Sequence, residues 1–191
     1  MAGDLGATTH DVHVKARDVL GFWFALTPEQ HFAKSARVDA QIKERFGALR
    51  DLVLGSGAAD WRGDPETLLA AIILLDQFSR NIHRDGAEAF AADPLALHLA
   101  LEAIGKGWDE SMSAEHRQFL YLPLEHAEDK AMQALSIEKF ESLGDAYLLG
   151  FAEKHAEVIA KFGRFPSRNA ALGRESTAEE LEFLKQDGAG W

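Results

Sequence analysis

Three dipeptides constrain the fold of this chain most, because each joins a helix-capping residue to a proline. They are Thr27-Pro28, Asp64-Pro65 and Asp93-Pro94. Threonine and aspartate cap the first N–H groups of a helix, and proline is tolerated at the first helical position. The spacings of Thr27 to Gln30 and of Thr177 to Glu180 also fit capping boxes. No segment alternates polar and apolar residues for long, so the pattern predicts an all-α protein.

These signals and the helical period of the apolar residues predict about seven helices. Their expected ranges are 9–25, 36–54, 65–84, 94–106, 114–133, 137–162 and 178–186. The short connections favour antiparallel packing of neighbouring helices in pairs. Pro123 falls inside the fifth range and is expected to kink that helix. No linker or low-complexity tract divides the chain, so residues 1–191 are expected to form a single domain.

The charge balance argues against several classes of partner. The chain has 31 acidic and 20 basic residues and a net charge of −11, which disfavours binding to nucleic acid or to anionic membranes. Its longest apolar run, Leu68–Leu75, is too short to span a bilayer. The first residues contain no basic start and no apolar stretch, so we expect no secretory signal and a cytoplasmic location. There is no cysteine, and phosphate-loop and dinucleotide-binding patterns are absent, so we expect no cofactor.

Polar side chains interrupt the apolar faces of three predicted helices. They are Asp76 and Arg80 in the third helix, His126 in the fifth with Glu125 and Asp129 on its flank, and His155 in the sixth. The apolar stripe around His155 is expected to run from Phe140 through Tyr147 to Ile159. An unpaired buried charge costs several kcal/mol, so these groups must meet partners, water or a ligand. Their presence on three helices favours one shared polar site.

Each of these features also has a purely structural interpretation. The carboxylate and guanidinium of the third helix stand four residues apart, as in an ordinary helical ion pair. A histidine on an apolar face is often a hydrogen-bonded core residue. Glu125, Glu128 and Asp129 can form a solvated acidic face. His126 and Asp129 have a spacing compatible with metal ligation, but no Glu-x-x-His or His-Glu-x-x-His motif is present, so we expect no metal.

A turn-rich segment, Phe162–Thr177, gathers Arg164, Arg168, Asn169 and Arg174. In a chain with a net charge of −11, three neighbouring arginines are not needed for solubility. A guanidinium group binds a carboxylate or a phosphate through two parallel hydrogen bonds. The segment is therefore expected either to clamp acidic groups of its own fold or to receive an anionic partner.

Three segments together resemble a bacterial protein family, the domain of unknown function 924. They are LDQFSRNIHR (Leu75–Arg84), FLYLPLEHAED (Phe119–Asp129) and HAEVIAKFGRFPSRNAALGRESTAEELEFL (His155–Leu184), and the resemblance extends to FWF (Phe22–Phe24). It implies a helical fold similar to tetratricopeptide-repeat proteins, that is, a right-handed superhelix, and it implies no reaction.

The resemblance also implies a set of polar residues for the family's motif. They are Asp76, Gln77, Arg80, Asn81, His126, Glu128, His155, Arg164, Arg168 and Asn169. The chain departs from the family pattern at Ser79, Ala127 and Ser167, where proline, serine and histidine are usual. The change at Ser167 removes one candidate proton carrier.

The leading hypothesis is a binding module that holds an anionic small molecule or a peptide in a polar pocket on the concave side of the helix stack. Its candidate binding residues are Asp76, Gln77, Arg80, Asn81, Glu125, His126, Asp129, His155, Arg164, Arg168 and Asn169. The oligomeric state is left open.

Two alternatives stay open. In the first, the protein is a hydrolase- or lyase-type enzyme, with His126 or His155 as general acid-base. In the second, it is a structural or interaction scaffold, in which the arginine segment pairs with Asp76, Glu128 and Glu175 and locks the C-terminal helices.

Overall fold

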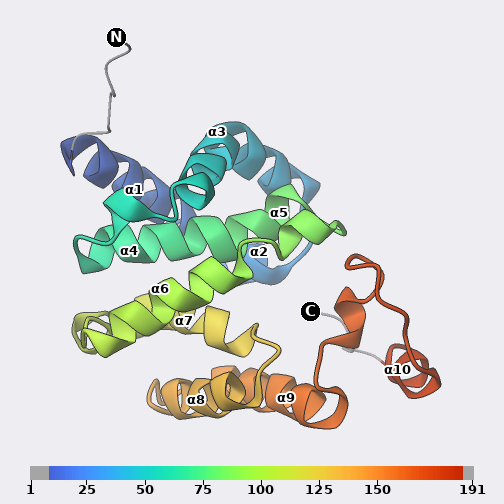
Figure 1. Cartoon of the computed structure of the whole chain (residues 1–191). Coiled ribbons are helices and arrows are strands. Elements are labelled where there is room, and N and C mark those ends of the chain that lie inside the picture. The colour runs from blue at the N-terminus through green and yellow to red at the C-terminus, as the bar shows by residue number, and fades with distance from the viewer. Residues whose placement is uncertain (1–8, 187–191) are drawn as a thin grey trace.

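The computed structural model, which describes residues 9–186, is all-helical over that range, and Figure 1 shows no strand there. The α-helices are α1 (Thr9–Trp23), α2 (Pro28–Phe32), α3 (Ala36–Gly55), α4 (Pro65–Ile72), α5 (Ser79–Ile82), α6 (Asp93–Gly105), α7 (Ala114–Glu125), α8 (Lys130–Glu141), α9 (Ala146–Phe162) and α10 (Ala178–Phe183). A π-helical turn, η2 (Ile73–Phe78), joins α4 to α5. Short 3₁₀ turns occupy Ala59–Trp61, Ala87–Ala89, Asp109–Ser111 and Pro166–Arg168. The all-α class is confirmed, with more helices than predicted.

Two stretches of the chain lie outside the described range. Residues 1–8 belong to the segment in which no secretory signal was predicted. Residues 187–191 are the last residues of the predicted domain.

The predicted capping residues are confirmed with one exception. Thr27 and Asp64 cap α2 and α4, and Thr177 caps α10 through a capping box. Asp93 is instead the first residue of α6, and the preceding Ala92 takes the cap position. The carboxylate of Asp93 is therefore free to bind elsewhere.

The helices stack in layers, as Figure 1 shows from the blue N-terminal helices to the orange α8 and α9. α1 packs on α4, while α3 packs on η2 and α5. α4 also contacts α6 and α7, and α7 contacts α8. The pairs α6–α7, α7–α8 and α8–α9 are neighbours in the sequence, as the short connections predicted. The C-terminal segment with α10 lies beside the stack, on the right in Figure 1.

The fifth and sixth predicted helices are three helices in the structure, so those two ranges were wrong. α7 ends at Glu125, where Gln133 Nε2 donates hydrogen bonds of 2.7 and 2.8 Å to the carbonyl oxygens of Glu125 and Ala127. A helix end leaves carbonyl groups without partners, and Gln133 supplies donors for them. Asp129 then caps α8. Pro123 lies inside α7, shortly before its end.

A second break separates α8 from α9. Gly144 has a φ of 72°, which favours glycine, and Asp145 caps α9. The break interrupts the predicted apolar stripe between Phe140, which is buried in α8, and Tyr147, which is 73% exposed. The assignment of Tyr147 to the core was wrong.

One apolar cluster holds the layers together. The run Leu68–Leu75 is buried over its whole length. Trp23 packs edge-on against Phe78 and Phe119, with ring centroids 5.5 and 5.4 Å apart. Fully burying a large apolar side chain stabilises a fold by about 1.5–3 kcal/mol. None of the described helices has the length and apolar character needed to cross a bilayer.

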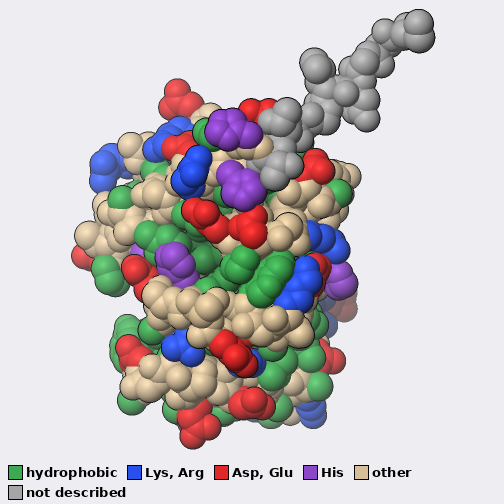
Figure 2. Space-filling model, turned by 90° about the vertical axis from the view of Figure 1, so that its left-hand side faces the viewer, with side chains coloured by type: hydrophobic (Ala, Val, Ile, Leu, Met, Phe, Trp, Pro, Cys, Tyr) green, Lys and Arg blue, Asp and Glu red, His purple; other side chains and the backbone are tan. Residues whose placement is uncertain are grey.

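One face of the molecule is shown in Figure 2, where lysine and arginine side chains lie among aspartate and glutamate side chains. Hydrophobic side chains group near the middle of this face. Such mixing of the two signs of charge is typical of an ordinary solvated surface.

Candidate functional site

His126 forms a hydrogen bond with a buried carboxylate, that of Asp76. Asp76 lies in η2, and π-helical turns are frequent at functional sites. His126 directly follows the last residue of α7, and its Nδ1 lies 2.8 Å from Asp76 Oδ1. Because an ionised carboxylate only accepts hydrogen bonds, Nδ1 carries the imidazole proton and Nε2 keeps its lone pair.

The neighbours of Asp76 keep it ionised. Gln77 Nε2 donates to Oδ2, and Arg80 Nη1 lies 3.1 Å from Oδ1. Burial opposes the charged form, but the positive charge of Arg80 and the hydrogen bonds from His126 and Gln77 outweigh it and hold the pKa of Asp76 well below its usual range. Burial, together with the charge of Arg80, lowers the pKa of His126. At neutral pH His126 is therefore an uncharged base.

Arg80 and Arg168 converge on the carboxylate of Asp93. Arg80 binds it with two hydrogen bonds of 3.0 and 3.1 Å, whereas Arg168 reaches it with one of 3.3 Å. The guanidinium of Arg168 lies 4.8 Å from the ring centroid of Phe90 and 4.6 Å from that of Phe165. Within the described range, Arg168 Nε is buried without a hydrogen-bond partner. Burial and the charge of Arg80 lower the pKa of Arg168 to about 10, so it remains a cation at neutral pH.

A second carboxyl–imidazole pair, Glu125 and His155, lies beside the first. His155 Nδ1 donates to the carbonyl oxygen of Phe151 at 2.9 Å and lies 3.2 Å from Glu125 Oε1. Burial, with the charge of Asp76 as a second cause, raises the pKa of Glu125 to about 8. Burial lowers the pKa of His155 to about 3. At neutral pH both groups are uncharged, and their contact is not an ion pair.

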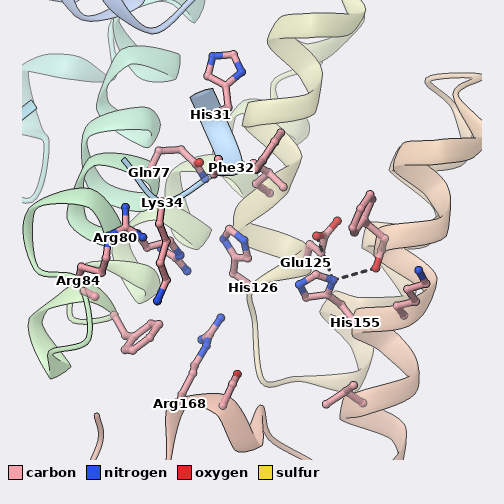
Figure 3. A pocket seen from close by; sticks show the side chains of 18 of the residues that line it. His31, Phe32, Lys34, Gln77, Arg80, Arg84, Glu125, His126, His155 and Arg168 are labelled. Atoms are coloured by element: carbon pink, nitrogen blue, oxygen red, sulfur yellow. Dashed lines mark hydrogen bonds and ion pairs between the residues drawn. The ribbon is translucent and has the colours of Figure 1, made fainter. Parts of the chain in front are cut away.

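These groups surround one pocket of about 940 Å³, a volume typical of small-molecule sites. In Figure 3 the side chains enter it from several parts of the chain, with His31 and Phe32 opposite Arg168, and with Arg80 opposite His155. The apolar part of its lining includes Phe32, Phe90, Leu122, Tyr147, Phe151 and Val158. The lining also includes Lys34, Arg84 and Lys154 and the acidic Asp85 and Glu157, and Arg84 is paired with Asp39.

Most of the predicted site residues meet at this pocket. Those that line it are Gln77, Arg80, Asn81, Glu125, His126, His155 and Arg168. Asp76 lies behind His126, with 1% of its side chain exposed. Asn81 donates to Asp39 Oδ1, which also binds Arg84. Asp129 is the cap of α8 and is not among the lining residues.

Arg164, Asn169 and Arg174 hold the C-terminal segment and do not line the pocket. Arg164 forms hydrogen bonds of 2.7 and 2.9 Å with Glu180, and Arg174 forms two of 2.6 and 2.8 Å with Glu128. Asn169 accepts from Arg174 at 2.9 Å. The predicted pairing with Glu128 is thus present, whereas Glu180 was not among the predicted partners. Arg164 and Arg174 therefore stabilise the C-terminal segment, whereas Arg168 lines the pocket.

Sequence reasoning missed several residues of the pocket. Asp93 was assigned only to a helix cap, and the aromatic residues Phe32 and Phe90 were not singled out. Phe32 and Tyr147 are large apolar side chains that are mostly exposed, which is a signal only once a structure is known. Within residues 9–186, no group of three or more His, Asp or Glu side chains is arranged to hold a metal ion.

The fold and the site define an all-helical protein with one polar, arginine-containing pocket. Its chain matches the model of a family described as "Bacterial protein of unknown function (DUF924)" over residues 19–188, and it belongs to that family. It is similar to a solved structure of a protein of unknown function from Agrobacterium tumefaciens, with 38% sequence identity and a TM-score of 0.87. That similarity covers 92% of this chain and 99% of the other. No curated protein matches the chain. The similarity to tetratricopeptide-repeat proteins stays a prediction.

Proposed function

We propose that this protein binds an anionic small molecule in the pocket, with a carboxylate of the ligand against Arg168. The observation that carries the proposal is the incomplete pairing of this arginine. Its side chain is only 7% exposed, yet it makes one 3.3 Å hydrogen bond to a carboxylate that Arg80 already holds. A guanidinium has five N–H donors and is costly to bury without acceptors. A ligand carboxylate supplies those acceptors.

The charges around the pocket support an anionic ligand. Asp76 and Asp93 are paired with Arg80, so they compensate cations that are already present. Glu125 is protonated at neutral pH and adds no negative charge. The lining holds five lysine and arginine side chains, Lys34, Arg80, Arg84, Lys154 and Arg168, against the acidic Asp85 and Glu157, and Lys34 lies 3.8 Å from Asp85. The enclosed volume favours a small molecule over a peptide.

A thermal-shift screen of small carboxylic acids and phosphate esters tests the proposal. A ligand at about 100 times its Kd stabilises the folded state by about 2.7 kcal/mol. For a protein of this size that is a rise in melting temperature of about 5–10 °C. We expect at least one acid to produce such a rise and Arg168→Gln to remove it.

Arg37→Gln is the matched control, because Arg37 is exposed and does not line the pocket. Its shift with the same acid is expected to equal that of the wild type. A complete absence of stabilisation across the screen, or an equal shift in Arg168→Gln, contradicts the proposal.

A second candidate function, acid-base catalysis by a hydrolase- or lyase-type enzyme, is favoured by the Asp76–His126 hydrogen bond of 2.8 Å. A carboxylate that orients an imidazole is the arrangement that general bases use in many enzymes. His155 is the weaker candidate for this role, because its Nδ1 donates to a backbone carbonyl instead.

The remaining parts of the proposal rest on composition. A net charge of −11 disfavours nucleic acid and anionic membranes as partners, and a chain without cysteine fits a cytoplasmic location.

A further inference from the structure

Two buried carboxyl groups beside the pocket, those of Asp76 and Glu125, are in opposite protonation states. Asp76 is ionised, because Arg80 and His126 lie within 3.1 Å of its carboxylate oxygen. Glu125 is 5% exposed and, within the described range, has no lysine or arginine at ion-pair distance. Its neighbour His155 is a neutral imidazole whose Nδ1 proton is donated to Phe151. A buried carboxyl group without a cation keeps its proton.

His126 is placed to accept a proton from a ligand. Its hydrogen bond to Asp76 fixes the proton on Nδ1, which leaves Nε2 as the basic atom. The side chain is 14% exposed and lines the pocket. Figure 3 shows the imidazole between Arg80, Arg168 and Glu125. A base and a protonated acid thus flank the space beside the anion-binding arginine.

We propose that the site catalyses the enolisation of 2-oxo carboxylic acids, with His126 as the base and Glu125 as the acid. This inference rests on the proposed binding of a carboxylate at Arg168. Among C–H groups, a neutral imidazole removes protons only from the acidic ones, such as those next to a carbonyl. A carboxylic acid kept neutral in a buried site donates to the oxygen on which negative charge develops.

The proton transfers balance. His126 Nε2 takes the proton of the C–H group next to the carbonyl, and the C–H electron pair forms the new C=C bond. The carbonyl π electrons take the proton of Glu125 and give the enol O–H group. Glu125 is left as a carboxylate and His126 as an imidazolium, and the return of the two protons restores the keto acid and the enzyme.

The apolar lining selects among 2-oxo acids. Phe32, Leu122, Tyr147 and Phe151 line the same pocket as the polar groups. Aromatic side chains bind apolar and aromatic groups through large contact areas. The substrate class is therefore a 2-oxo acid with a large apolar or aromatic substituent, for which phenylpyruvate is a suitable probe.

Proton exchange in D₂O tests the inference without knowledge of the natural product. The loss of the ¹H NMR signal next to the carbonyl is followed for phenylpyruvate and for 2-oxo acids with smaller substituents. We expect the protein to accelerate this loss above the buffer rate, most for phenylpyruvate. His126→Gln is expected to lower the protein-dependent rate by about 100-fold or more. Glu125→Gln, which keeps the shape of the side chain, is expected to lower it by about tenfold or more.

The controls separate this inference from the binding proposal. His10→Gln, at an exposed position outside the pocket, is expected to exchange at the wild-type rate. If the acids raise the melting temperature but none exchanges above the buffer rate, the inference is wrong and the binding proposal stands. If exchange is equal in wild type, His126→Gln and Glu125→Gln, the inference is also wrong. If no acid of either panel binds, both proposals fail.

Discussion

Arg168 donates to Asp93 through a single nitrogen at 3.3 Å, although the same carboxylate accepts two shorter hydrogen bonds from Arg80. One partly buried carboxylate thus serves two cations, and the buried one, Arg168, is left incompletely paired. Arg168 lines the pocket and combines a positive charge with an Nε–H group that has no hydrogen-bond partner within the described residues. This relationship is the basis of the proposed anion site.

Asp93→Asn should strengthen anion binding while it weakens the fold. The substitution removes the negative charge that competes with a ligand carboxylate for Arg168, so we expect the Kd of a bound acid to fall about tenfold. It also weakens two charged hydrogen bonds to Arg80, at a cost of about 1–3 kcal/mol in the free energy of unfolding. Calorimetric titration and chemical denaturation measure the two effects. Weaker binding in this variant is the contrary result.

Asp76→Asn should separate catalysis from binding. An amide does not hold the imidazole of His126 in the tautomer with the proton on Nδ1, and loss of such orientation costs up to about 10⁴-fold in rate. We expect phenylpyruvate to bind with less than a tenfold change in affinity, while proton exchange falls at least 100-fold. Saturation-transfer NMR measures the binding in the sample used for exchange. Unchanged exchange would show that Asp76 does not position His126.

Glu125→Gln should stabilise the protein at neutral pH. Burial raises the pKa of Glu125 to about 8, so the folded state keeps a proton that the unfolded state loses near its ordinary pKa of 4.5. The stability that this proton contributes is present in full below pH 4.5 and is lost as the pH rises through 8. At pH 7 the free energy of unfolding of the variant should exceed that of the wild type by about 2–3 kcal/mol.

At pH 4 the two proteins should be equally stable, because Glu125 is then protonated in both states. Urea denaturation at the two pH values measures the difference. A variant less stable than the wild type at pH 7 contradicts the assignment of Glu125 as a neutral acid.

Glu180→Gln should reduce the sensitivity of the fold to acid. The hydrogen bonds from Arg164, and then from the backbone N–H of Thr177, lower the pKa of Glu180 from 4.5 to about 2. The stability contributed by the ionised group is present above pH 4.5 and is lost as the pH falls towards 2. The wild type should therefore melt at a higher temperature than the variant at pH 7, and this difference should vanish near pH 2. The melting temperatures of both proteins between pH 7 and pH 2 measure this difference. A difference that does not change with pH contradicts the prediction.

Most of the helices and several polar residues of the pocket lining could be predicted from the sequence, because both follow from local patterns. The caps at Thr27, Asp64 and Thr177 bind backbone N–H groups only two or three residues away. Polar residues on apolar faces, such as His126 and His155, must meet partners wherever the chain folds. The helical period therefore indicated that they share a site without indicating its shape.

The break between α7 and α8 could not be predicted in the same way. The segment from Glu125 to Asp129 contains no glycine or proline. The end of α7 depends instead on Gln133, whose side-chain amide donates to carbonyl groups of this segment. Which arginine lines the pocket is also determined by tertiary contacts. Arg164 and Arg168 lie in one loop, and only the distant positions of Glu180 and Asp93 decide which one faces the pocket.

A crystal structure of the protein with the acid that raises its melting temperature most tests the central claim. We predict that the ligand carboxylate lies within hydrogen-bond distance of Arg168, in the space bounded by Arg80 and His126. A ligand bound with its carboxylate away from Arg168, or outside this pocket, would contradict the account.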